Sequence, residues 1–407
     1  MNSIPTRPEG TPRIVSLDAV RGFDMFWIVG GAPVFRALAA LAPRPVEDAV
    51  ATQLEHTAWR GLHFYDLIFP LFLFLVGVGA ALSLDKLIAQ RGVATAVRRV
   101  VRRAVILYVL GVVYDGGLAL GWDRVRWIGV LQEIAACYLV AGLLYCGAKR
   151  RLAVVAAAVP VMLLAHWALL RFVPFPDLTV TPEGLAPFIH RLGTTDPATI
   201  AAAAPGMTRG VFEHGRNLAN YLDFRFLPGK KPEPYFAWEG LLSPLSATTL
   251  CLIGILCGRL LLDDAIPPPR KVALLLGGGV LLVAAGLGWS LEMPLVKKLW
   301  ASSFCLVGAG YGAAVLGLFY WVMDVKKVGR GIAAPWIWIG ANPITLYVAS
   351  GIVPFTPLAK RIIGPEVQRW LDSCARGGAD LAVCLVAFVL LLAFARLLYV
   401  KRIFLRL

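Results

Sequence analysis

Residues 56–79 read His56-Thr-Ala-Trp-Arg-Gly-Leu-His63-Phe-Tyr-Asp66-Leu-Ile-Phe-Pro-Leu-Phe-Leu-Phe-Leu-Val-Gly-Val-Gly79. A polar segment with two histidines leads directly into a long apolar run. A helix needs about 20 mostly apolar residues to cross a hydrocarbon core about 30 Å thick, and this run can supply them. The stretch therefore predicts a titratable imidazole at the rim of a membrane, where it can exchange a proton with an external substrate.

The rest of the chain has the composition of a membrane protein. Of its 407 residues, 58% are hydrophobic and 16% are charged, and the mean hydropathy is +0.71. Backbone groups in lipid must be hydrogen-bonded within the spanning segment, and these continuous apolar runs favour helices over the alternating strands of a barrel. We predict an all-α polytopic bundle of about ten transmembrane helices, forming one domain over residues 1–407. The predicted spans are 22–42, 65–84, 104–122, 127–147, 152–172, 241–262, 272–291, 301–323, 333–353 and 380–399.

The net charge is +15, and its distribution over the loops indicates which side of the membrane each loop faces. With the N-terminus inside, the internal segments carry 20 Lys and Arg residues and the short external loops carry 10. Basic residues concentrate on the cytoplasmic side of membrane proteins, so both termini are expected to be cytoplasmic. The first 16 residues lack the apolar core of a signal peptide, and no removal of a leader is expected. The expected surroundings are a lipid bilayer, with no nucleic-acid partner.

One predicted connection, residues 173–240, is much longer than the others and is expected to be external. It is rich in Pro, Gly and polar residues, and its Asn, Asp and aromatic content is typical of a surface that binds carbohydrate. We therefore propose saccharide contacts for Asn220, Asp223, Glu239 and the following Ser243. The alternative, a solvated loop with local packing, stays open.

Ionisable residues near the spans are further candidates, because each is costly to place in lipid. Asp18 and Arg21 are three residues apart, so they share a helix face and form either a structural ion pair or part of a ligand site. Arg102 and Arg103 belong to a basic cluster that either fixes the topology or holds the phosphates of a cytosolic donor.

Two features inside later spans indicate a polar cavity. Glu133 is expected to be protonated, paired or beside water, because an unpaired ionised carboxylate is costly in lipid. Asn342 precedes Pro343, which should interrupt the ninth helix. Asp24 and Arg36 are further ionisable residues, within or at the edge of the first span. A transporter or channel in which Asp24, Arg36 and Glu133 relay protons or bind a polar solute is therefore an alternative function.

The cysteines do not indicate a metal or disulfide framework. Six of the seven lie in apolar spans, and the chain has no C-x-x-C or Cys/His ligand spacing. It also has no Walker A motif, so ATP-driven pumping by this chain is not expected. No metal cofactor is predicted.

Several blocks of the sequence resemble the heparan-α-glucosaminide N-acetyltransferase family of multispanning acyltransferases and its bacterial members, in the order found in that family. The blocks are Ser16-Leu-Asp-Ala-Val-Arg-Gly22, His56-Thr-Ala-Trp-Arg-Gly-Leu62, Asp66-Leu-Ile-Phe-Pro-Leu-Phe-Leu-Phe-Leu-Val-Gly77, Gly129-Val-Leu-Gln132, Glu239-Gly-Leu-Leu-Ser243, Pro294-Leu-Val-Lys-Lys-Leu-Trp300-Ala-Ser-Ser-Phe304 and Gly340-Ala-Asn342. The resemblance implies a multi-pass enzyme, here of a bacterial inner membrane. It would transfer an acetyl group from cytosolic acetyl-CoA to an amino sugar or other saccharide on the external side.

The same resemblance implies roles for individual residues. The family's catalytic histidine opens the motif that begins at His56, and a general base there would act on the acceptor. Asp66 would either orient His56 or cap the second helix, and Trp59 would contact the saccharide. The donor-side assignments are Asp18, Arg21, Arg102, Arg103, Gln132 and Asn342.

The resemblance leaves two mechanisms open. The acceptor could attack acetyl-CoA directly, which we favour, or an acetyl-histidine could form at His56. Pro45 stands where human-type members have an asparagine, so acceptor recognition is expected to differ from theirs. A homodimer is possible.

Overall fold

The computed structural model describes residues 14–328 and 333–403. The chain forms two compact units. Of the described residues, one unit contains 14–54, 265–278, 313–328 and 333–403, and the other contains Glu55–Asp264 and Gly279–Gly312. The prediction about a signal peptide and the basic residues Arg7, Arg13, Arg330 and Arg406 lie outside the described residues.

The elements are helical apart from two short strands. Those of the first unit are α1 (Val15–Phe26), the π-helix η1 (Trp27–Gly31), α2 (Ala32–Ala39), α3 (Arg44–Gln53), the π-helix η6 (Trp321–Val325), α13 (Ala334–Ala341), α14 (Pro343–Ile352), α15 (Phe355–Cys374) and α16 (Gly378–Val400). Those of the second unit are the 3₁₀ helix η2 (Phe64–Leu67), α4 (Ile68–Tyr114), η3 (Gly117–Leu120), η4 (Trp122–Arg124), α5 (Val130–Gly147), α6 (Leu152–Phe172), β1 (Phe175–Pro176), α7 (Pro182–Leu192), α8 (Pro197–Ala202), β2 (Met207–Thr208), α9 (Leu218–Phe226), α10 (Ser243–Leu262) and η5 (Lys297–Leu299). Helices α11 (Pro268–Trp289) and α12 (Ser302–Tyr320) contribute residues to both units.

Seven helices in the described part of the chain are long and apolar enough to cross a membrane, as expected for an integral membrane protein. They overlap eight of the ten predicted spans, because the helix over Phe64–Tyr114 contains the span 65–84 and the first part of the span 104–122. The other two predicted spans fall on shorter helices: 22–42 on α1, η1 and α2, and 333–353 on α13 and α14.

Helix α4 differs from the prediction of two spans joined by a loop. Residues 85–103, expected as an internal loop, are helical on both sides of a break at Gly92, so the connection between the two helical stretches is much shorter than expected. Their Ala, Leu, Lys and Arg content supports helix formation even where the segment is charged. Gly92 bends the helix, since its φ of 79° lies in the left-handed region that glycine tolerates best.

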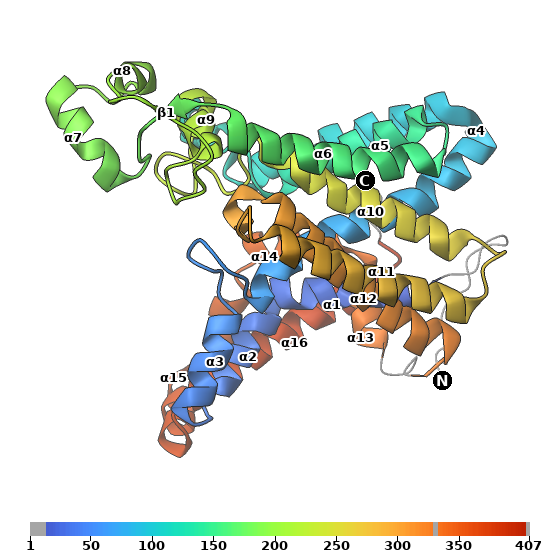
Figure 1. Ribbon diagram of the computed structural model, residues 1–407. Helices are drawn as coiled ribbons and strands as arrows, with labels where there is room; N and C mark the ends of the chain where they lie inside the picture. Colours follow the sequence, from blue (N-terminus) through green and yellow to red (C-terminus); the bar gives the residue numbers. More distant parts are fainter. Residues whose placement is uncertain (1–13, 329–332, 404–407) are drawn as a thin grey trace. The chain divides into compact units, whose positions relative to one another are not determined.

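The second unit is built on closely packed helices. Helix α10 packs against α4, α5 and α6, and Figure 1 shows these segments running alongside one another. Glycines permit the close approach of α4 and α10. A Cβ added at Gly77 would lie 2.0 Å from the backbone oxygen of Cys251, and one at Gly254 would lie 2.1 Å from that of Phe74. Small residues at such crossings let helix backbones meet in membrane proteins.

The segment 173–240 is an ordered subdomain, whereas a long loop was expected. It contains α7, α8, α9 and the antiparallel pair β1 and β2, shown in green in Figure 1. Its own apolar core consists of Leu178, Val180, Leu185, Ile200, Phe224 and Phe236. These residues are spread over nearly 60 positions between polar stretches, so the sequence shows no single periodic pattern for them.

The first unit confirms two local predictions. Asp18 and Arg21 form an ion pair of 3.8 Å on α1. Asn342 separates α13 from α14, and its side-chain amide donates to the backbone oxygen of Ile403 at 3.0 Å. Helix α1 packs directly on α13, where a Cβ on Gly340 would lie 1.9 Å from the backbone oxygen of Asp18.

Candidate active site

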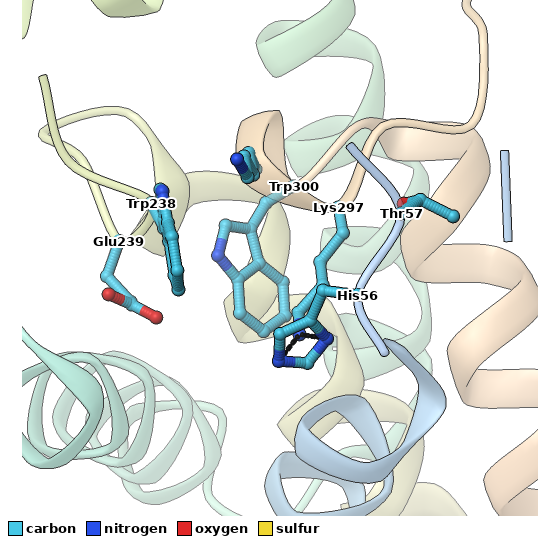
Figure 2. Close-up of a pocket in the computed structure, with 7 residues that line it drawn as sticks. His56, Thr57, Trp238, Glu239, Lys297 and Trp300 are labelled. Carbon is cyan, nitrogen blue, oxygen red and sulfur yellow. Dashed lines mark hydrogen bonds between the residues drawn. The ribbon is translucent and has the colours of Figure 1, made fainter. Parts of the chain in front are cut away.

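A pocket with about 280 Å³ of empty space, partly open to solvent, lies within the second unit. Three separate segments form it: the loop before η2, the residues just before α10, and η5 with the residue that follows it. Figure 2 shows the pocket with its side chains as sticks. The lining residues are His56, Thr57, Trp238, Glu239, Lys297, Lys298 and Trp300.

His56 and Asp66 form a hydrogen-bonded pair at this pocket. The distance from His56 Nδ1 to Asp66 Oδ1 is 2.9 Å. The Asp66 side chain is fully buried, whereas 35% of the His56 side chain is exposed. An ionised Asp66 carboxylate can only accept a hydrogen bond, so Nδ1 of the imidazole is the donor in this pair. The neutral ring then keeps a lone pair on Nε2. Such an imidazole can accept a proton from a bound substrate.

Asp66 makes the contacts that both of its predicted roles require. Its second carboxylate oxygen accepts hydrogen bonds from the backbone N–H groups of His63 at 3.0 Å and Thr57 at 3.3 Å. The bond from His63 is part of a capping box at the start of η2. One carboxylate therefore fixes both the beginning of the helix and the imidazole ring. His63 itself lies in a non-helical segment, with its Nδ1 3.0 Å from the Glu55 backbone oxygen.

The protonation of His56 suits a base at neutral pH. Burial lowers the pKa of His56 from its ordinary value of 6.5, the Asp66 hydrogen bond opposes this, and the ammonium groups of Lys297 and Lys298 lower the pKa further. The imidazole is consequently neutral in most molecules at pH 7, which is the form that accepts a proton.

Lys297 lies closest to this pair. Its Nζ is 2.8 Å from His56 Nδ1, 3.1 Å from His56 Nε2 and 3.6 Å from Asp66 Oδ1. Burial lowers the pKa of Lys297 to about 8, although the carboxylates of Asp66 and Glu239 oppose the shift. The lysine is held in place by η5 and by the following Trp300, which is buried and has a left-handed φ of 49°.

The opposite side of the pocket carries Glu239. Its carboxylate accepts a hydrogen bond from Arg126 at 3.1 Å, and Arg126 also contacts Asp115 at 3.4 Å. Burial raises the pKa of Glu239, which the positive charge of Arg126 opposes. Gln132 joins the same network, since its amide donates to the Arg126 backbone oxygen at 3.2 Å. The sequence placed Gln132 on the donor side, and the structure connects it with the Glu239 side of the pocket.

Indole rings form the walls of the pocket. In Figure 2 the Trp300 indole lies between Trp238 and the His56–Lys297 contact. Trp238 is held by a hydrogen bond from its Nε1 to Glu233 at 3.1 Å, and the Lys298 ammonium lies 4.9 Å from its ring centroid. Lys298 is itself paired with Glu233 at 3.0 Å. Flat apolar rings beside polar groups fit a ligand that presents both kinds of surface.

The other predicted saccharide contacts have partners within the protein. Trp59 donates through Nε1 to the Phe212 backbone oxygen at 2.8 Å and packs against the apolar core of the 173–240 subdomain. Ser243 donates to Glu133 at 3.0 Å, and the expected protonation, arginine pairing or hydration of Glu133 stays a prediction. The contacts that Trp59 and Ser243 were expected to make with a saccharide stay predictions.

Asn220 and Asp223 are buried and organise the backbone. Asn220 accepts hydrogen bonds from the Gly215 N–H at 3.1 Å and from the Asn217 amide at 2.6 Å. Asp223 accepts from the N–H groups of Ala237 at 3.1 Å and Leu241 at 2.9 Å. Asp223 thereby fixes the segment that carries Trp238 and Glu239. Its effect on the pocket is through that segment.

The predicted donor-side residues are not brought together at this pocket. Arg102 is exposed on α4, and Arg103 stacks its guanidinium 4.7 Å from the Tyr138 ring centroid. Asp18, Arg21 and Asn342 belong to the first unit. Their role in binding a donor stays a prediction.

Lys297, Lys298, Trp238 and Trp300 were not among the predicted site residues. The two lysines had been counted only as external charges, although they lie within the Pro294–Phe304 block. Trp238 immediately precedes the block that begins at Glu239. Their position inside or beside a block that resembles the family, together with their charge or aromatic ring, could have identified them as site residues.

Comparisons with known proteins indicate one family. The family model described as "Heparan-alpha-glucosaminide N-acetyltransferase, catalytic" matches residues 13–187, a range that contains His56 and Asp66. The resemblance to the heparan-α-glucosaminide N-acetyltransferase family is confirmed. A human protein named heparan-alpha-glucosaminide N-acetyltransferase is 24% identical over 378 residues, covering 83% of this chain and 52% of its own length. The mouse protein of the same name is 24% identical over 353 residues, covering 74% of this chain and 49% of its own.

The chain thus spans about half the length of these two curated relatives. The family match, which ends at residue 187, includes the loop of His56 but not Trp238, Glu239 or Lys297. In the part of the chain that the structure describes, no cluster of three or more His, Cys, Asp or Glu side chains could hold a metal ion.

Proposed function

We propose that this protein is a membrane-embedded acetyltransferase. It transfers an acetyl group from cytosolic acetyl-CoA to an amino or hydroxyl group of a saccharide on the external side. The observation that carries the proposal is the His56–Asp66 pair at an indole-walled pocket. The match of residues 13–187 to the catalytic family model and the names of the two relatives support the same chemistry.

In the proposed reaction, His56 is the general base. The acceptor nitrogen or oxygen attacks the thioester carbon while its proton moves to His56 Nε2. Asp66 holds Nδ1–H and stabilises the imidazolium that forms. The tetrahedral intermediate then collapses, the carbon–sulfur bond breaks, and the CoA thiolate takes the proton from His56. Direct attack needs no acetyl-histidine, and the long arm of the donor lets the thioester reach a pocket distant from its phosphates.

Acetyl-CoA binding distinguishes this proposal from a transporter of a polar solute, which needs no acyl donor. Purified protein titrated with acetyl-CoA in a calorimeter should show saturable binding, and His56→Ala should retain it because His56 acts on the acceptor. Absence of acetyl-CoA binding by the wild-type protein would contradict the proposal.

We further propose the ten-span arrangement, with both termini cytoplasmic in the inner membrane of a bacterium and residues 173–240 outside. The 20-to-10 distribution of basic residues supports this orientation. It places His56, Glu239 and Lys297 on the same external side. Their observed proximity within one pocket is compatible with that arrangement.

The orientation predicts the labelling of Cys374, an exposed free cysteine near the end of α15. A membrane-impermeant maleimide added to intact cells should label it, since the segment between the last two proposed spans is external. Cys374→Ser should remove the signal. A cysteine placed at the exposed Lys149 in that background should react only after permeabilisation. Labelling of Cys374 only in permeabilised cells would contradict the orientation.

A further inference from the structure

Lys297 occupies a position that the general-base mechanism does not use. Its ammonium is within 3.1 Å of both ring nitrogens of His56, and only 14% of its side chain is exposed. A lysine usually leaves its charge in water. Here the chain instead directs it into the pocket, from a 3₁₀ turn followed by a buried tryptophan. The segment therefore presents a cation beside the base.

The charges around Lys297 come from three neighbouring segments. Asp66 at η2 and Glu239 before α10 are negative, Lys298 on its own turn is positive, and His56 is the titratable neighbour. Asp66 is already engaged by the His56 ring and two backbone N–H groups. At 3.6 Å, the ammonium is farther from Asp66 than from the imidazole. Lys297 therefore forms an ion pair with Asp66, while its ammonium lies closer still to the imidazole at the pocket.

In acyl transfer, a cation beside His56 Nε2 can stabilise the negative charge that develops on the attacked carbonyl oxygen. When the acceptor nitrogen or oxygen is hydrogen-bonded to His56 Nε2, the attacked carbonyl carbon lies next to it. The carbonyl oxygen then comes within reach of a cation that sits about one hydrogen-bond length from Nε2. Negative charge develops on this oxygen during the attack, and a fixed positive charge stabilises it most in a site shielded from water.

We propose that Lys297 is a catalytic residue that binds the carbonyl oxygen of the acyl thioester and stabilises the oxyanion of the tetrahedral intermediate. The inference rests on the proposed acetyl transfer. As the new bond to carbon forms, the carbonyl π electrons move to the oxygen beside the ammonium. When the carbonyl is restored, the carbon–sulfur bond breaks and its electrons leave with the thiolate. Lys297 keeps its proton throughout, and His56 carries the transferred proton.

Two substitutions separate this role from its alternatives. Lys297→Met removes the charge and should lower kcat by about 10²–10³-fold, the usual cost of losing one oxyanion donor, with a smaller change in KM. Lys297→Arg keeps the charge and cannot act as a base, so it should retain more activity than Lys297→Met. If kcat of Lys297→Arg were as low as that of Lys297→Met, the charge-based role would be overturned. The exposed Lys230→Met is the matched control and should behave as wild type.

A spectroscopic measurement tests contact with the donor directly. Infrared difference spectra of bound acetyl-CoA, labelled with ¹³C at the carbonyl, should show a lower stretching frequency in the wild type than in Lys297→Met. A purely structural lysine would leave this frequency unchanged even if kcat fell, and that result would overturn the inference. Normal kcat in Lys297→Met would overturn it too. Absence of transfer by the wild type would instead count against the proposed function.

Discussion

Replacing His56 with alanine should lower kcat for acetyl transfer by about 10²–10⁴-fold, the usual contribution of a general base. The acceptor would lose the group that takes its proton, while the acyl donor would keep its own contacts. The measurement is the steady-state rate of acetyl-CoA consumption with glucosamine as acceptor, together with calorimetric binding of acetyl-CoA to the same preparation. Binding should persist as activity falls.

The control for this variant is His190→Ala, which changes an exposed histidine on α7 away from the pocket. It should leave kcat unchanged. Wild-type kcat in His56→Ala, at equal folded yield, would remove His56 from the mechanism. Loss of both transfer and acetyl-CoA binding would show that His56 acts on the donor, contrary to the general-base role.

Asp66→Asn should also be severely impaired, with kcat lower by about 10²–10⁴-fold. The substitution keeps the shape of the side chain but removes the negative charge that holds the Nδ1–H tautomer and stabilises the imidazolium. Because the Asp66 hydrogen bond and charge both raise the pKa of His56, that pKa should fall in the variant. The profile of log kcat/KM against pH would test this shift.

The sign of the pH effect follows from the form of His56 that is active. Activity is lost as pH falls through the pKa of His56, because the imidazolium cannot accept a proton. Asp66→Asn should move this acid limb to lower pH. Lys297→Met should move it to higher pH, because a neighbouring positive charge that lowers the pKa is removed. Shifts in the same direction would contradict the electrostatic description of the pocket. Asp48→Asn, at an exposed position on α3, should shift nothing.

Local sequence patterns predicted the features that depend on neighbouring residues. The long apolar runs predicted membrane-spanning helices, and Pro343 predicted the break at Asn342. The three-residue spacing of Asp18 and Arg21 predicted their ion pair. In each case the relevant physics acts within a few residues: helix length, the missing proline N–H, or one turn of helix.

Features that depend on distant contacts were not predictable in this way. Lys297 is separated from His56 by 241 positions, and no spacing rule relates them. The 173–240 subdomain was expected as a loop because its few core residues are interrupted by polar stretches. In α4, the charged residues 85–103 were expected as a loop, whereas they are helical apart from a break at Gly92, because their composition favours a helix.

The central claim is acetyl transfer with His56 as base, and one assay tests it most directly. Purified protein in proteoliposomes is supplied with acetyl-CoA labelled with ¹⁴C in the acetyl group and with glucosamine as acceptor. Labelled acetylglucosamine is then separated and counted for the wild type and His56→Ala. The account predicts time-dependent product with the wild type and at least about 10²-fold less with the variant. No product with the wild type, or equal product with both proteins, would contradict it.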